Sequence, residues 1–182
     1  VMMDKIGDLV QGAVYRLPLK MESGTMRAAT SPVDGLIYYS GLTGWQAGAT
    51  QEGSIQRLRF TGEEGIYLKQ AKARENRLEL TFTETVEPEK LDPSSFAASA
   101  WNYRWSKGYG SPTFMLSEPD TRGTEELTIQ DLSLSQDGKT LLVAIPGLQP
   151  CHNLKLDFAV TGANGSGLKG PVYFTIHKLP QS

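Results

Sequence analysis

The residue types best suited to ligand binding gather in one aromatic stretch, residues 101–112. Trp101, Tyr103 and Trp105 are two residues apart, so in an extended strand their side chains would project from one face. Flat aromatic faces cover the apolar C–H patches of a sugar ring, while neighbouring polar side chains satisfy its hydroxyls. The spacing therefore indicates a candidate carbohydrate platform. Tyr109, in the glycine-rich end of the stretch, is the loop residue that we expect to be exposed.

Structural alternatives stand beside this interpretation. Large aromatic side chains are mostly buried, so the stripe is also typical of the core face of a strand, and burial tendencies favour that alternative. A third alternative is an interface with the first third of the chain. Trp45, in the glycine-rich loop 41–48, is either a binding residue mounted on a loop or, as we favour, an anchor packed under the sheet. The candidate ligand-binding residues are therefore Trp101, Tyr103, Trp105, Tyr109 and Trp45.

Metal and thiol chemistry have little support in the sequence. The chain contains two histidines and one cysteine. Cys151, His152 and His177 lie in no spacing of the H-x-x-x-H or C-x-x-C kind that brings metal ligands together. A lone Cys151 forms no internal disulfide and offers no haem attachment motif, so we expect a packed, inert thiol. The sequence predicts no metal site and no cofactor.

Nucleophilic and acid–base catalysis have no clear constellation either. Ser111 and Ser166 lie in Gly-Ser-Pro and Gly-Ser-Gly sequences rather than in a G-x-S-x-G elbow. Paired carboxylates for glycoside hydrolysis need a defined separation that a sequence does not show, and solvated strand ends are the ordinary alternative. The acids concerned are Glu84, Glu87, Glu89, Asp92, Glu125 and Glu126. The pairs Asp137-Gly138 and Asn164-Gly165 are explained as turn formers. We predict no catalytic residue in this chain.

The composition is typical of a protein of strands and turns. The 182 residues include 19 glycines and 10 prolines, and the β-branched and aromatic residues lie in short runs. A formal net charge of −2, with Lys and Arg scattered among the acids, argues against a nucleic-acid partner. No apolar run approaches the roughly 18 residues that a membrane span needs, and the first residues lack the apolar core of a signal peptide. We expect an all-β fold without a membrane span.

The strands that must position the aromatic residues fall into two groups. Residues 1–64 contain a lead-in or short helical turn at 1–12 and four short runs near 14–17, 25–29, 36–40 and 54–60, which predict a small antiparallel sheet. Residues 65–182 continue with alternating strands roughly 8 to 12 residues apart, a spacing typical of a β-sandwich. An aromatic-rich insertion at about 101–126 interrupts this second group.

The first group resembles the last blade of the β-propeller in quinoprotein sugar dehydrogenase-like domains. The segments that carry this resemblance are 12–18, 23–27, 34–38 and 53–58. A propeller needs typically four to eight blades. The resemblance therefore implies that the catalytic and cofactor residues of such an enzyme would lie outside this chain.

The second group resembles the bacterial Ig-like domains of surface and secreted proteins, over residues 66–178. The resemblance is carried by segments 78–84, 86–96, 132–141, 148–150 and 162–170. The insertion at about 101–126 is the main departure from that pattern. Taken together, the chain is similar to the C-terminal region of large multi-domain exported bacterial proteins, in which such a propeller runs into such a sandwich.

These resemblances imply a blade-like sheet followed by an Ig-like sandwich. The function that they imply is a non-catalytic accessory or structural module of an exported protein, periplasmic or extracellular. Its expected partners are neighbouring domains and polysaccharide. The alternative is the C-terminal part of a quinone- or haem-linked sugar dehydrogenase-like enzyme whose active site lies elsewhere.

Overall fold

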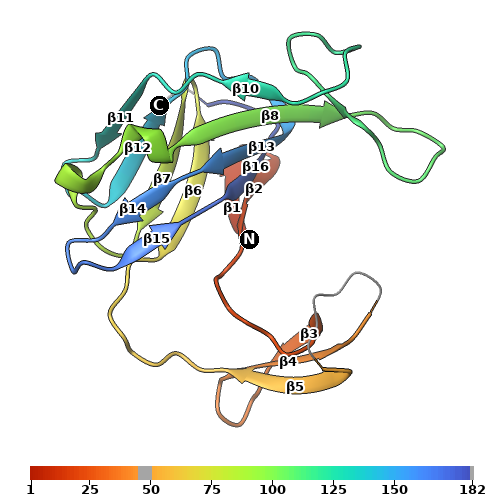
Figure 1. Ribbon diagram of the computed structural model, residues 1–182, viewed down its shortest axis with the longest axis vertical. Coiled ribbons are helices and arrows are strands. Elements are labelled where there is room, and N and C mark those ends of the chain that lie inside the picture. The colour runs from red at the N-terminus through yellow and green to blue at the C-terminus, as the bar shows by residue number, and fades with distance from the viewer. Residues whose placement is uncertain (45–50, 181–182) are drawn as a thin grey trace. The chain divides into compact units, whose positions relative to one another are not determined.

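The computed structural model describes residues 1–44 and 51–180, and every strand pairing within them is antiparallel (Figure 1). The expected all-β fold is confirmed: the helical elements in these residues are two single 3₁₀ turns, η1 (Pro88–Lys90) and η2 (Pro93–Ser95). The chain forms two compact units. The larger comprises Val1–Arg16 and Glu64–Ser182, and the smaller comprises Leu17–Glu63.

The larger unit is built on two sheets and a short hairpin. The first sheet has the order β1 (Met2–Ile6), β2 (Leu9–Tyr15), β16 (Val172–Ile176), β13 (Cys151–Asp157), β8 (Ala97–Tyr103) and β10 (Glu125–Leu127), with β9 (Thr113–Phe114) paired to the end of β8. The second sheet has the order β11 (Asp131–Leu134), β12 (Thr140–Ala144), β7 (Arg77–Phe82) and β6 (Leu68–Arg74). The hairpin pairs β14 (Ala159–Thr161) with β15 (Gly167–Lys169).

One hydrophobic core lies between the two sheets, and period-two alternation creates it. In β7 the side chains of Leu78, Leu80 and Phe82 are fully buried, and the residues between them are half-buried. Leu154 and Leu156 of β13 contribute in the same way from the first sheet. Full burial of one such side chain stabilises the fold by roughly 1.5–3 kcal/mol, so the shared core is the main force that holds the sheets together.

The N-terminal hairpin belongs to the larger unit, so the expected first group loses residues 1–16, while the division near residue 64 agrees with the structure. β1 and β2 are joined by a turn in which Gly7 has φ 59°, and β2 pairs with β16 over four residues. Residues 1–12 therefore contain strands rather than a helical turn. Sequence reasoning misassigned these residues because β2 pairs with β16, the last strand of the described residues.

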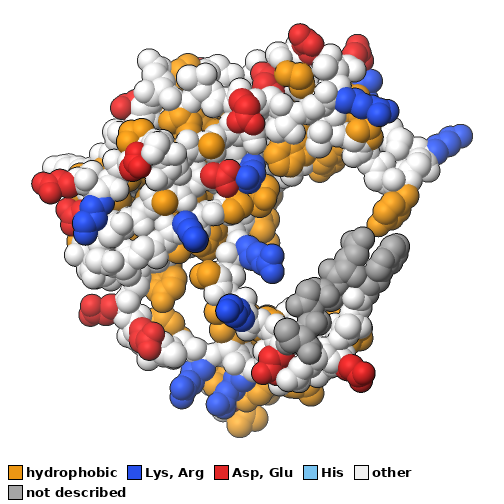
Figure 2. Space-filling view, viewed as in Figure 1, with side chains coloured by type: hydrophobic (Ala, Val, Ile, Leu, Met, Phe, Trp, Pro, Cys, Tyr) orange, Lys and Arg blue, Asp and Glu red, His pale blue; other side chains and the backbone are white. Residues whose placement is uncertain are grey.

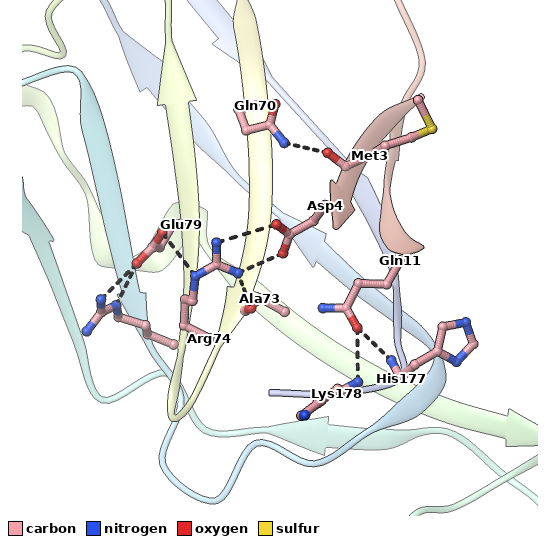
Figure 3. Close-up of polar contacts among 10 residues, drawn as sticks. Met3, Asp4, Gln11, Gln70, Ala73, Arg74, Glu79, His177 and Lys178 are labelled. Carbon is pink, nitrogen blue, oxygen red and sulfur yellow. Dashed lines mark hydrogen bonds and ion pairs between the residues drawn. The ribbon is translucent and has the colours of Figure 1, made fainter. Parts of the chain in front are cut away.

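Polar contacts fasten this hairpin to the second sheet and to the C-terminal end of β16 (Figure 3). Arg74 on β6 extends toward Asp4 on β1 and toward Glu79 on β7, with its Nη1 atom 2.7 Å from Asp4 Oδ2. Gln11 is buried, and its Oε1 atom accepts hydrogen bonds from the backbone N–H groups of His177 at 2.9 Å and Lys178 at 3.0 Å. These contacts give the buried side chains of Asp4 and Gln11 hydrogen-bonding partners, as burial requires.

The smaller unit is a three-stranded sheet, β3 (Gly24–Thr30), β4 (Ile37–Leu42) and β5 (Gly53–Leu58). It has one strand fewer than the sequence predicted for residues 1–64, because the first of the four expected strands is β2. At Gly41, strands β3 and β4 approach so closely that a Cβ atom at this position would lie 1.7 Å from the carbonyl oxygen of Gly24. Among the described residues of this unit, Ser23 alone is buried.

Candidate functional site: an aromatic cleft beside His152

Strand β8 turns its aromatic side chains away from the core. Ala98 and Ala100 are the buried core residues of this strand, so alternation places Trp101 and Tyr103 on the opposite, outer face of the sheet. Trp101 is half-buried and Tyr103 is exposed. The expectation that these residues form a core face is therefore wrong, because alanines occupy the core positions.

Strand β8 ends before the last of the three aromatic residues. β8 stops at Tyr103, and Trp105 lies in the loop that joins β8 to β9, where its side chain is fully exposed. Tyr109 of the same loop is also fully exposed, which confirms the expectation for that residue. The three aromatic residues therefore do not lie on one continuous strand: Trp101 and Tyr103 lie on the sheet, and Trp105 lies in the hairpin that projects beyond it (Figure 1).

Arg104 fixes the base of this hairpin. Its guanidinium lies 4.5 Å from the centre of the Phe114 ring on β9 and forms an ion pair with Asp120. Its backbone N–H donates to Ser111 Oγ at 3.1 Å, which ties the two ends of the loop together. A cation over an aromatic face and an ion pair each contribute modestly at exposed sites, but together they hold one geometry.

His152 on β13 completes the arrangement. Its Nδ1 atom accepts a hydrogen bond from the backbone N–H of Tyr103 at 3.1 Å, and its own backbone N–H donates to Asn102 Oδ1 at 2.8 Å. The imidazole and the Tyr103 ring are tilted by 39° with their centroids 4.8 Å apart. The pairing register of β13 shifts between Cys151 and Leu154, at the place where His152 lies.

These residues line an open cleft of about 490 Å³. Its walls come from the hairpin residues between Tyr103 and Ser111 and from His152, and the lining includes the aromatic side chains of Tyr103, Trp105 and Tyr109. No carboxylate is among the described residues that line it. The cleft offers aromatic faces, hydroxyl groups, the Arg104 residue and one imidazole, which together can bind a polar ligand with apolar faces.

The remaining candidates do not assemble into a second site. Trp45 lies outside the described residues, and Trp101 is not among the residues that line the cleft. Cys151 is buried, as expected, and burial raises the pKa of its thiol to about 12. A thiol of that kind is not a nucleophile near neutral pH.

The acidic residues are held in local structure. Glu125 Oε2 accepts hydrogen bonds from the backbone N–H groups of Ser117 at 2.7 Å and Leu116 at 2.9 Å, and the bond from Ser117 holds the pKa of this carboxyl below its usual range. The Ser135 hydroxyl likewise lowers the pKa of Asp137, whose turn is completed by Gly138 at φ 67°. Within the described residues, no group of three or more His, Cys, Asp or Glu side chains is placed to hold a metal ion.

The surface charges are mixed. On the face that Figure 2 shows, Lys and Arg side chains are interspersed with Asp and Glu over the described residues. Among the residues that the structure describes, no helix has the length and hydropathy needed to cross a membrane.

Comparison of the chain with protein-family models and with curated proteins finds no match. Its geometry is therefore the ground for any functional proposal.

His152 is the site residue that sequence reasoning missed. It lies 49 positions from Tyr103, and a register shift adjoins it, so spacing along the chain does not reveal the contact. The aromatic stretch itself was the only usable signal.

Proposed function

We propose that this chain is a non-catalytic accessory module of an exported multi-domain protein and binds carbohydrate in the cleft beside His152. The observation that carries the proposal is the full exposure of Trp105 and Tyr109 on a hairpin whose base is fixed by Arg104. Large aromatic side chains that are exposed close together are typical of interaction sites. Aromatic faces beside hydroxyl donors match the C–H faces and hydroxyl groups of sugars.

The strand order supports the Ig-like part of the proposal. An Ig-like sandwich of the constant type has one sheet of strands ABED and another of strands CFG. In the larger unit, β6-β7-β12-β11 follows the order A-B-E-D, and β8-β13-β16 follows the order C-F-G. On this assignment β10 is a further strand beside C, and the β1–β2 hairpin is an addition beside G.

The smaller unit supports membership of a larger assembly. A three-stranded sheet needs a covered hydrophobic face for stability, yet Leu42 and Ile55 are exposed in this sheet. The alternative role, as part of a sugar dehydrogenase-like enzyme, has less support. The expected blade loses its first strand, because β2 pairs with β16 in the larger unit.

Titration with polysaccharides tests the carbohydrate proposal. A panel of neutral glucans, xylans, mannans and chitin oligomers is titrated while tryptophan emission is recorded, and we expect at least one member to quench it. Trp105→Ala combined with Tyr109→Ala should abolish the quenching without unfolding the chain, since both side chains are fully exposed.

The matched control is Tyr173→Ala. Tyr173 is an exposed aromatic residue of the first sheet that does not line the cleft. This variant should bind as the unmodified chain does. A flat titration across the whole panel would remove the proposal.

A further inference from the structure

A backbone hydrogen bond sets the tautomer of the neutral imidazole of His152. Because Nδ1 accepts a hydrogen bond from the Tyr103 N–H, it carries no proton, and the neutral ring bears its proton on Nε2. Within the described residues Nε2 makes no hydrogen bond, although the ring lines the cleft. The cleft therefore contains one ring N–H donor whose partner has to come from the ligand or from water.

The neighbouring groups favour an uncharged ligand. The titratable or charged groups that β8 and the following loop contribute near the imidazole are Tyr103, Arg104, Lys107 and Tyr109. On the other side of β13, Cys151 pairs with Ile176 of β16, so His177 is the next residue after that pair. Arg104 lines the cleft, but its guanidinium is paired with Asp120, and Lys107 is not among the lining residues. The cation that lines the cleft among the described residues therefore already has a carboxylate partner.

We propose that His152 binds the ligand of this cleft, donating from Nε2 to an acceptor oxygen of a neutral saccharide, and that uronate polymers are disfavoured at neutral pH because the cation lining the cleft is already paired. This inference rests on the proposed carbohydrate-binding function and adds the ligand class and the residue that reads it. A protonated imidazole would turn a second N–H toward the N–H of Tyr103, and the hydrogen bond that orients the ring would be lost. Acid therefore weakens binding of a neutral saccharide.

The test measures affinity at about pH 8 and about pH 5, a range in which histidine changes charge and tyrosine does not. The probes are the neutral polysaccharides of the panel, with polygalacturonate and alginate as uronate polymers. For the unmodified chain, we expect the affinity for the best neutral probe to fall about tenfold at the lower pH, the factor produced by one lost hydrogen bond of typical strength. The uronate polymers should not bind at the higher pH.

Three variants separate recognition from a structural role. His152→Gln keeps an acceptor for the Tyr103 N–H and a donor for the ligand but has no titratable group, so its affinity should change little between the two pH values. His152→Phe keeps a ring beside Tyr103 without polar atoms, and should bind about tenfold more weakly at the higher pH. His177→Gln removes the other of the chain's two histidines and should keep the full pH dependence.

The outcomes are distinguishable from failure of the proposed function. The inference is overturned if His152→Gln keeps the pH dependence, if His152→Phe binds normally, or if uronate polymers bind more tightly than neutral ones. In each of these cases, sensitivity to Trp105→Ala would leave the cleft a carbohydrate site. Absence of binding by any probe at both pH values overturns the function and the inference together.

Discussion

Arg74 of the second sheet and Asp4 of the N-terminal hairpin form a largely buried ion pair, with 2.7 Å between Nη1 and Oδ2. The Asp4 side chain is only 7% exposed and that of Arg74 only 15%. Removing one partner of such a pair leaves an uncompensated charge in a site of low polarity, which is costly. The pair therefore makes the attachment of β1 to β6 sensitive to a single substitution.

We expect Arg74→Ala to lower the free energy of unfolding by about 3 kcal/mol. Urea denaturation followed by far-UV circular dichroism measures this loss. Lys155→Ala is the matched control, because the ion pair of Lys155 with Asp157 is much more exposed and should contribute far less to the free energy of unfolding. Equal losses in the two variants would contradict the role assigned to burial.

Glu125 should make the stability of the insertion depend on acid. Its folded pKa is lowered from the usual value of 4.5 by the hydrogen bonds from Ser117 and Leu116. A carboxyl with a lowered folded pKa contributes stability that is complete above pH 4.5 and is lost as the pH falls through that lowered value. The midpoint of urea denaturation should therefore fall between about pH 5 and about pH 3, and Glu125→Gln should reduce this fall.

The control for that experiment is Glu126→Gln, the neighbouring position on the outer face of β10. Alternation turns the two carboxyls to opposite faces of the strand, so the control should keep the acid dependence of the unmodified chain. Loss of the dependence in both variants would mean that it comes from net charge.

Cys151 should be protected from thiol reagents in the folded state. Its side chain is buried, and burial raises the pKa of the thiol to about 12. Near pH 8 a reagent therefore cannot reach the sulfur, and the thiol does not ionise to the reactive thiolate. Labelling by a disulfide reagent should be slow without denaturant and should accelerate as urea opens the fold. Ser106→Cys places a thiol in the exposed loop and should react at once. Fast labelling of native Cys151 would show that β13 opens readily.

The regular alternation of the chain made much of the larger unit predictable. Leu78, Leu80 and Phe82 are the inward residues of β7, as their spacing indicated, and the Asp137-Gly138 turn lies where its residue types predict. These features depend on neighbours along the chain, and local sequence records them well.

Features that depend on distant partners were not predictable. The face of β8 was misjudged because large aromatic side chains usually point inward, whereas here the small side chains of Ala98 and Ala100 fill the core positions. The hairpin β1–β2 was placed in the wrong unit because its contacts with β16 and Arg74 join residues far apart in sequence. The contact between Tyr103 and His152 has the same character.

The pairing of β2 with β16 also sets the order in which the chain can fold. Val14 on β2 lies opposite Tyr173 on β16, so a strand needs as its partner one that is synthesised more than a hundred residues later. Pairings of such long sequence separation are slow to form, because the cost of closing the loop comes before the contacts that repay it. The first sheet therefore closes only after β16 has been synthesised, and until then β2 pairs with β1 alone.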